Sequence, residues 1–248
     1  MVCMRVAGFA LILLVLSGCG KKNGVVPAVD TTINNSQTPP AIHPNDSVSY
    51  LALGDSYTYG SGISQSESYP YQLAAQLRHQ DYRVIDPDVV AFQGWTAADL
   101  LVGIKTANVT HTFDFVTLLI GVNDEHRGTD HATYTTQADQ LITQAIAYAR
   151  GYSRRIFVLS IPDWSVTPFA TGMDRAKIKA DVAAFNSINE AECKKLGANY
   201  LDISAISELA ADDPTLTAAD GLHPSAKMYA LWVGQLLPVV QGSFGIGH

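Results

Sequence analysis

Short apolar runs alternate with longer segments of helical periodicity from Val48 onward. Apolar runs of about four to eight residues indicate buried strands, and apolar residues three or four positions apart indicate helices. The pattern predicts five strands, over residues 48–53, 83–92, 113–120, 155–161 and 199–203, and the second of them is interrupted by Asp86-Pro87-Asp88. It predicts helices over residues 69–80, 96–105, 131–152, 174–196 and 224–236. Strands that alternate with helices and are apolar throughout predict an α/β fold, with one parallel sheet covered on both faces.

The first 18 residues follow a different pattern. An apolar run of eleven residues, 6–16, comes after the basic Arg5. A bilayer core needs about 20 apolar residues, so this run is typical of a secretory signal rather than of a membrane span. The sequence Leu16-Ser17-Gly18-Cys19 that closes it resembles the lipobox of bacterial lipoproteins. We therefore expect residues 1–18 to be a lipoprotein signal peptide and Cys19 to carry lipid. The alternative is an ordinary signal peptide in which Cys19 has no special role.

A polar segment separates this signal from the rest of the chain. Residues 20–47 are rich in Thr, Asn, Pro and Ser and have no hydrophobic period, which predicts a disordered tether. Together with Cys19 it makes up residues 19–47, and one folded domain takes residues 48–248. We expect an exported protein of the bacterial cell envelope that is lipid-anchored to a membrane.

Charge and cysteine content narrow the possible partners. The formal net charge is −7, and it becomes −8 once residues 1–18, whose only charged side chain is Arg5, are removed. Lys and Arg are scattered along the chain, so nucleic acid is not an expected partner. Cys193 is the only thiol left in the folded part, and its helical spacing with apolar residues predicts an inert buried thiol. We expect a monomer.

Two polar motifs lie near the two ends of the folded part. Gly54-Asp55-Ser56 follows the first predicted strand directly. Open α/β sheets bind ligands at the carboxyl ends of their strands, so Ser56 is a candidate nucleophile. Asp220-Gly-Leu-His223 precedes the last predicted helix, and a carboxylate on such a turn can hold the imidazole while its free nitrogen accepts a proton. Taken singly, the first motif is also typical of a turn or helix N-cap, and the second of an N-cap Asp beside a surface His.

Two further motifs follow predicted strands. Gly121-Val-Asn123-Asp lies at the end of the most apolar strand, where the Asn123 amide could donate to a developing oxyanion. The alternative for this motif is an Asx turn. Gln93-Gly94-Trp95 follows the second strand, and a glycine there lets its backbone N–H approach a substrate closely.

Together the four motifs resemble the sequence blocks of the SGNH/GDSL hydrolases, in the same order and over nearly the whole folded part. The resemblance implies a flavodoxin-like three-layer α/β/α sandwich with a central five-stranded parallel sheet. It also implies serine hydrolase chemistry, with Ser56 as nucleophile, His223 as base and Asp220 as the acid that orients it. The residues that match the family's oxyanion hole are Ser56, Gly94 and Asn123.

Other site types find less support in the sequence. Tyr57 stands where the family name has Leu, but this position follows the nucleophile and leaves the chemistry unchanged. The chain has no Gly-x-Ser-x-Gly, Gly-x-Gly-x-x-Gly or Walker motif, so neither an α/β-hydrolase elbow nor a nucleotide site is indicated. One loop is rich in Asp and His, but no pair has a recognised metal-ligand spacing, so we expect no metal and no cofactor. The residues in that loop are Asp124, His126, Asp130 and His131.

The motifs and the resemblance predict a serine esterase that acts through an acyl-enzyme on a small-molecule, glycan or lipid ester. A carbohydrate O-deacetylase or acyltransferase with the same triad, and a non-catalytic surface-binding lipoprotein, remain alternatives. Residues 161–170 resemble a loop of exported bacterial members, and we expect them to form a wall of the acyl or leaving-group pocket. The alternative is an ordinary connection from strand to helix with a half-buried Trp164.

Overall fold

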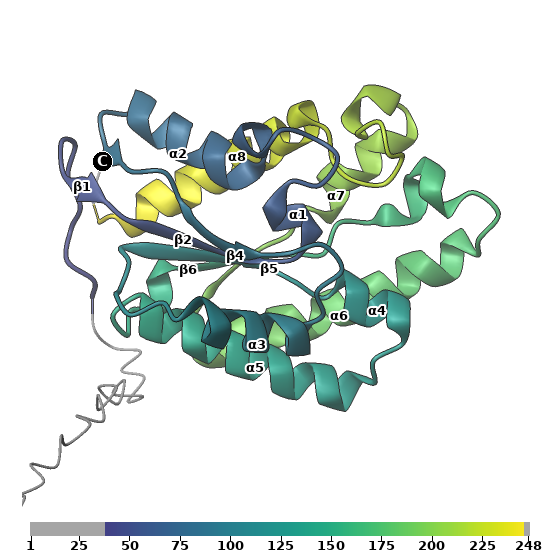
Figure 1. The fold of residues 1–248 in the computed structure, drawn as a ribbon, viewed down its shortest axis with the longest axis horizontal. Coiled ribbons are helices and arrows are strands. Elements are labelled where there is room, and N and C mark those ends of the chain that lie inside the picture. Colours follow the sequence, from purple (N-terminus) through teal and green to yellow (C-terminus); the bar gives the residue numbers. More distant parts are fainter. Residues whose placement is uncertain (1–37, 246–248) are drawn as a thin grey trace, which may run out of the picture.

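The structure is a computed structural model that describes residues 38–245. Five parallel strands form one sheet in the order β4-β2-β5-β6-β7 (Figure 1). These strands are β2 (Tyr50–Gly54), β4 (Asp88–Ala91), β5 (Phe115–Leu119), β6 (Ile156–Leu159) and β7 (Asn199–Leu201). A separate two-stranded sheet pairs β1 (Ser47–Val48) with β3 (Arg83–Val84). The expected signal peptide, Cys19 and the tether up to residue 37 lie outside the described residues.

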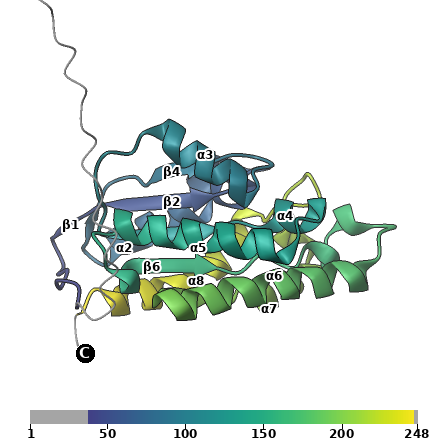
Figure 2. The same cartoon turned by 90° about the horizontal axis from the view of Figure 1, so that it is seen from below.

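Helices cover both faces of the five-stranded sheet. Helices α2 (Tyr69–His79) and α8 (Ala226–Ser243) lie on one face, and α3 (Ala97–Ala107), α5 (His131–Tyr148) and α6 (Arg175–Leu196) on the other (Figures 1 and 2). The shorter α-helices are α1 (Ser56–Tyr59), α4 (Val122–Arg127) and α7 (Ser204–Ser207). The 3-10 turns are Gln65–Glu67, Ser153–Arg155, Trp164–Val166, Pro168–Ala170, Glu208–Ala211 and Pro214–Leu216. The predicted three-layer α/β/α sandwich is confirmed.

The position of β2 between β4 and β5 determines where a site can form. All residues of β2 and β5 are buried, as expected for strands covered on both faces. Strand β2 pairs with both β4 and β5, so the chain leaves it toward one side of the sheet and later returns on the other. In such sheets the crevice at the carboxyl end of this strand is where ligands bind. Gly54, the last residue of β2, lies at that carboxyl end.

Two predicted elements have different bounds in the structure. The strand predicted over residues 83–92 is two strands, because Asp86-Pro87-Asp88 breaks it: β3 pairs with β1, and β4 pairs with β2. The closing helix was expected over residues 224–236, and Pro238, which cannot donate a backbone hydrogen bond, lies just beyond that end. Instead α8 continues to Ser243, and the burial of Val240 and Phe244 accounts for the longer helix.

The packed domain begins before residue 48, the predicted boundary. Arg155 Nη2 donates to the carbonyl of Pro40 over 2.6 Å, and Ile42 N–H donates to the carbonyl of Phe244 over 2.9 Å. Ile42 is buried, and the Arg155 guanidinium lies over the Phe244 ring. These contacts lie at the amino edge of the sheet, opposite the carboxyl ends of the strands (Figure 1). Residues 38–47 are therefore part of the folded unit rather than of the tether.

Cys193 is buried, and burial raises the pKa of its thiol to about 12, which agrees with the predicted inert thiol.

No helix among residues 38–245 is both long enough and apolar enough to cross a membrane.

Candidate active site

The turn that follows β2 places Ser56 at the carboxyl edge of the sheet. Asp55 caps α1, since the Tyr57 N–H donates to Asp55 Oδ1 over 2.9 Å. Ser56 is the first residue of α1, and only 5% of it is exposed. A side chain at Gly54 would overlap the carbonyl oxygen of Leu119 on β5. Glycine at this position thus allows the nucleophile turn to pack directly against the neighbouring strand.

The turn before α8 holds His223 by a carboxylate. His223 Nδ1 lies 2.7 Å from Asp220 Oδ2, and the Leu222 and His223 N–H groups donate to Asp220 Oδ1 over 2.9 and 3.0 Å. Burial by itself would raise the pKa of Asp220, but these hydrogen bonds outweigh it and lower that pKa below its usual value. Asp220 is therefore ionised at neutral pH and accepts from His223 Nδ1–H. This bond leaves His223 Nε2 free to take a proton.

Two other segments pack against this turn. Gly62 has a φ of +84°, and a Cβ there would come within 2.6 Å of Asp220 Oδ2. The Phe169 N–H donates to the carbonyl of Gly221 over 2.9 Å. Gly221 itself has a φ of +76°, a conformation that favours glycine. The position of Asp220 is thus fixed by the segment after α1 and by the loop after β6.

Gly94 and Asn123 come after β4 and β5, the two strands that flank β2. Gly94 has a φ of +80° in a turn closed by the Trp95 N–H donating to Phe92 O over 3.3 Å. Asn123 Nδ2 donates to the Trp95 carbonyl over 2.9 Å, and Arg127 Nη2 donates to the Gly94 carbonyl over 2.7 Å. An amide nitrogen carries two hydrogens, so Asn123 keeps a second donor for another acceptor. The Gly94 turn and α4 are therefore held together as one unit.

One cavity of about 180 Å³ brings these motifs together. Ser56, Gly94, Asn123 and His223 all line it, and Asp220 lies behind His223. Its other lining residues are Tyr57, Gln93, Val122, His126, Trp164, Phe169 and Leu222. Within residues 38–245 no hydrogen bond joins Ser56 Oγ to His223, and in ligand-free sites such catalytic hydrogen bonds often form only when substrate binds. All five predicted site residues thus converge on a single cavity.

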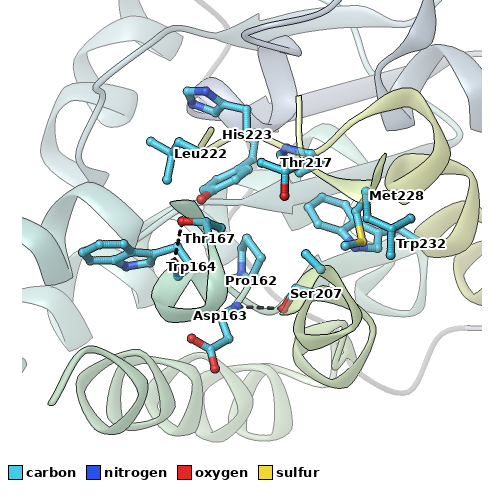
Figure 3. Close-up of a pocket in the computed structure, with 14 residues that line it drawn as sticks. Pro162, Asp163, Trp164, Thr167, Ser207, Thr217, Leu222, His223, Met228 and Trp232 are labelled. Carbon is cyan, nitrogen blue, oxygen red and sulfur yellow. Dashed lines mark hydrogen bonds between the residues drawn. The ribbon is translucent and has the colours of Figure 1, made fainter. Parts of the chain in front are cut away.

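The loop after β6 forms one wall of this cavity. Trp164 is buried, its Nε1 donates to Glu125 Oε2 over 2.9 Å, and both Trp164 and Phe169 line the cavity. Figure 3 shows the inner side of the loop, where Trp164, Thr167 and His223 lie around a small inner pocket. The volume of this inner pocket is about 20 Å³. This placement agrees with the expectation that the loop forms a wall of the pocket. Trp164 is buried, whereas the alternative of an ordinary connection expected it to be half-buried.

The comparison with protein families decides the identity of the chain. Residues 52–231, more than half of the chain, match the GDSL-like lipase/acylhydrolase family, and the match contains all four motifs. The chain belongs to this family. It is therefore an ester-hydrolysing enzyme. A comparison with curated protein sequences finds no significant match.

Solved structures share the fold of this GDSL-like hydrolase. The psychrotrophic esterase EstA from Pseudoalteromonas sp., inhibited by monoethylphosphonate, matches with 18% identity and a TM-score of 0.60, over 81% of this chain and 99% of EstA. A variant of Axe2, an acetyl xylan esterase from Geobacillus stearothermophilus, matches with 16% identity and a TM-score of 0.61, over 82% and 97%. The extracellular lipase from Streptomyces rimosus matches with 22% identity and a TM-score of 0.59, over 79% and 99%.

The GDSL-like hydrolase has a buried carboxyl group, Asp124, for which the sequence indicated no role in the site. Asp124 Oδ2 accepts from the Ala97 N–H over 2.8 Å and so ties the start of α3, just after the Gly94 turn, to α4. Burial raises the pKa of Asp124 to about 6. Within residues 38–245 no group of three His, Cys, Asp or Glu side chains is arranged to hold a metal. In the sequence, Asp124 is only an acid that follows Asn123, and an Asx turn would have the same residues. The tie between α3 and α4 was therefore not predictable.

A second buried carboxyl group lies next to the nucleophile. Asp55 is fully buried, and its Oδ2 has no hydrogen-bond partner among the described residues. Burial, with a smaller contribution from Asp124, raises the pKa of Asp55 to about 8. Asp55 is therefore largely protonated at neutral pH. The sequence pattern identified Asp55 only as part of a turn.

Proposed function

We propose that this GDSL-like hydrolase cleaves carboxylic esters through a Ser56–His223–Asp220 triad and a covalent acyl-enzyme. The observation that carries the proposal is the 2.7 Å contact between Asp220 Oδ2 and His223 Nδ1, with His223 and Ser56 in one cavity. A carboxylate that fixes an imidazole beside a serine is the arrangement that activates a hydroxyl for acyl transfer.

In the first step His223 Nε2 takes the hydroxyl proton while Ser56 Oγ bonds to the ester carbonyl carbon. The carbonyl oxygen becomes an oxyanion, which the Ser56 and Gly94 N–H groups and the second amide hydrogen of Asn123 stabilise. Removing one such donor typically costs about 2.7–4 kcal/mol of transition-state stabilisation. The bond to the alkoxy group then breaks, and His223 gives its proton to the leaving alcohol.

Water repeats the sequence on the acyl-enzyme. His223 Nε2 takes a proton from water, whose oxygen bonds to the acyl carbon, and the second oxyanion is held by the same donors. The bond to Ser56 Oγ breaks, His223 returns the proton to Ser56, and the carboxylic acid leaves. Asp220 stabilises the imidazolium in both steps and stays ionised, in keeping with its lowered pKa.

The test compares Ser56→Ala with the matched variant Ser66→Ala on an aryl acetate. We expect Ser56→Ala to lose at least about 1,000-fold in kcat, as in other serine hydrolases that lose the nucleophile. Ser66 is exposed and lies away from the cavity, so Ser66→Ala should keep kcat within twofold. Retention of a tenth or more of kcat in Ser56→Ala would rule out Ser56 as nucleophile.

We also propose that the enzyme is exported and lipid-anchored through Cys19. The basic start, the eleven-residue apolar run and the Leu-Ser-Gly-Cys sequence support this proposal. Fractionation of bacteria that express the full chain tests it: the wild type should sediment with membranes, and Cys19→Ser should not be lipidated. Equal amounts of wild type and Cys19→Ser in the membrane fraction, both without attached lipid, would contradict the proposal.

A further inference from the structure

A second cavity adjoins the catalytic cavity. It has a volume of about 370 Å³, roughly twice that of the catalytic cavity, and it lies between α4 and the start of α6. His126 and Trp164 line both cavities. His126 follows Asn123 by three positions on α4, so the two side chains lie on the same side of that helix. The His126 and Trp164 rings meet edge to face with centroids 5.6 Å apart. The two cavities therefore adjoin each other at His126 and Trp164.

Six of the ten residues that line the second cavity are polar or charged, and each charged one has an ion-pair or hydrogen-bond partner. Lys177 forms an ion pair with Asp181 one turn along α6. Arg127 donates to the Gly94 carbonyl, and Glu125 accepts from Trp164 Nε1. No single charge here faces the cavity without an opposite charge or a hydrogen bond of its own among the described residues. Such a surface suits a neutral ligand with many hydroxyl groups, which both donate and accept, better than an ion or a hydrocarbon chain.

The catalytic cavity has a different character. Its walls around Ser56 include the apolar side chains of Val122, Phe169 and Leu222. A volume of about 180 Å³ is below the roughly 300 Å³ at which drug-sized ligand pockets begin. This volume and these apolar walls suit a short acyl part of an ester. The larger and more polar alcohol part then has the second cavity available.

We propose that the substrate is a short-chain acyl ester of a polyhydroxylated alcohol such as a sugar, whose alcohol part binds in the cavity between α4 and α6. The inference rests on the proposed function, because it assumes acyl transfer at Ser56. His126 and Trp164 contact the substrate near the scissile bond, and Lys177 and Asp181 hydrogen-bond to hydroxyl groups farther out. A site that hydrogen-bonds substrate hydroxyls discriminates strongly against analogues that lack them.

The test compares two esters with the same acetyl group, a singly acetylated disaccharide and hexyl acetate. In the wild type we expect kcat/KM to be at least tenfold higher for the sugar ester. The double variant Lys177→Ala/Asp181→Ala should lower the ratio of the two kcat/KM values at least tenfold, mainly through a higher KM for the sugar ester. Met173→Trp, which adds bulk to the same cavity from an exposed position, should change the ratio in the same direction.

The matched control is Lys195→Ala/Asp139→Ala, which removes an ion pair between α6 and α5 away from both cavities. It should leave the ratio unchanged. A wild type that prefers hexyl acetate or a lysophospholipid, or a ratio that neither cavity variant lowers, would overturn the inference. The proposed function fails separately, if Ser56→Ala still hydrolyses both esters.

Discussion

Asp220 uses both carboxylate oxygens to hold His223. One oxygen lies 2.7 Å from His223 Nδ1, and the other accepts two backbone N–H groups. In Asp220→Asn an amide N–H would face Nδ1 and favour the wrong tautomer of the imidazole. We predict a fall in kcat on an aryl acetate of about 1,000-fold or more, with little change in KM.

The control for this prediction is Asp212→Asn, an exposed acid eight residues earlier that lines none of the cavities around the triad. It should keep kcat within twofold. A value of kcat for Asp220→Asn within threefold of the wild type would mean that Asp220 does not orient His223.

Asp55 should make stability depend on pH. Its pKa is about 8 in the fold because of burial, against an ordinary value near 4 when unfolded. Between these two values the folded state holds a proton that the unfolded state has lost, so the free energy of unfolding falls as pH rises. The limiting slope is about 1.4 kcal/mol per pH unit.

In Asp55→Asn the new side chain has a similar shape and cannot ionise. The fall in the free energy of unfolding that Asp55 causes as pH rises should therefore disappear. The free energy of unfolding can be measured in urea at pH 5 and pH 7 for both proteins. The value for the variant minus the value for the wild type should increase by about 2–3 kcal/mol from pH 5 to pH 7. A stability difference between the two proteins that is the same at both pH values would show that Asp55 ionises normally in the fold.

At the scale of elements, the end of β2 depends on a glycine. A Cβ at Gly54 would overlap Thr58 Oγ1 and the Leu119 carbonyl, so Gly54→Ala must push β2 away from β5 or shift α1. We predict a loss of about 1–3 kcal/mol or more in the free energy of unfolding, measured in urea. Activity should fall as well, because Ser56 moves with α1.

Gly234 on α8 provides the matched control. It lies in the helix interior, and a Cβ there meets no atom within 4 Å. Gly234→Ala should therefore stabilise the protein by about 0.5–1 kcal/mol. If the two substitutions had equal effects on stability, close packing at Gly54 would not be the cause.

The order of elements was predictable from the sequence because each strand is an apolar run bounded by turn residues. The bounds were less predictable where tertiary packing overrides local preference. Pro238 favours a helix end, yet buried Val240 and Phe244 extend α8 past it. Asp86-Pro87-Asp88 predicted an interruption, but only the structure shows that β3 and β4 belong to different sheets.

At the scale of the whole molecule, the placement of Ser56, Gly94 and Asn123 was predictable because their motifs follow strands whose carboxyl ends share one edge. Asp220 and His223 were candidates because of their spacing on the turn before the last helix. The supporting residues were not predictable, because a buried Asp124 or Glu125 cannot be told from a surface acid without knowing which backbone groups face it. The second cavity was also hidden, since α4 and α6 are far apart in sequence. Residues 38–42 pack at the opposite edge of the sheet, so the site and the start of the domain lie at opposite ends (Figure 1).

The most direct measurement of the central claim is covalent labelling of the intact enzyme with an aryl ethylphosphonate ester, followed by mass spectrometry. The triad predicts one adduct per chain, formed when Ser56 Oγ bonds to phosphorus, the P–O bond to the aryloxy group breaks and the aryloxide leaves. Peptide mapping should place this adduct on Ser56. Ser56→Ala should remain unlabelled, and Asp220→Asn should label much more slowly. An adduct on any other residue, or equal labelling of wild type and Ser56→Ala, would contradict the account.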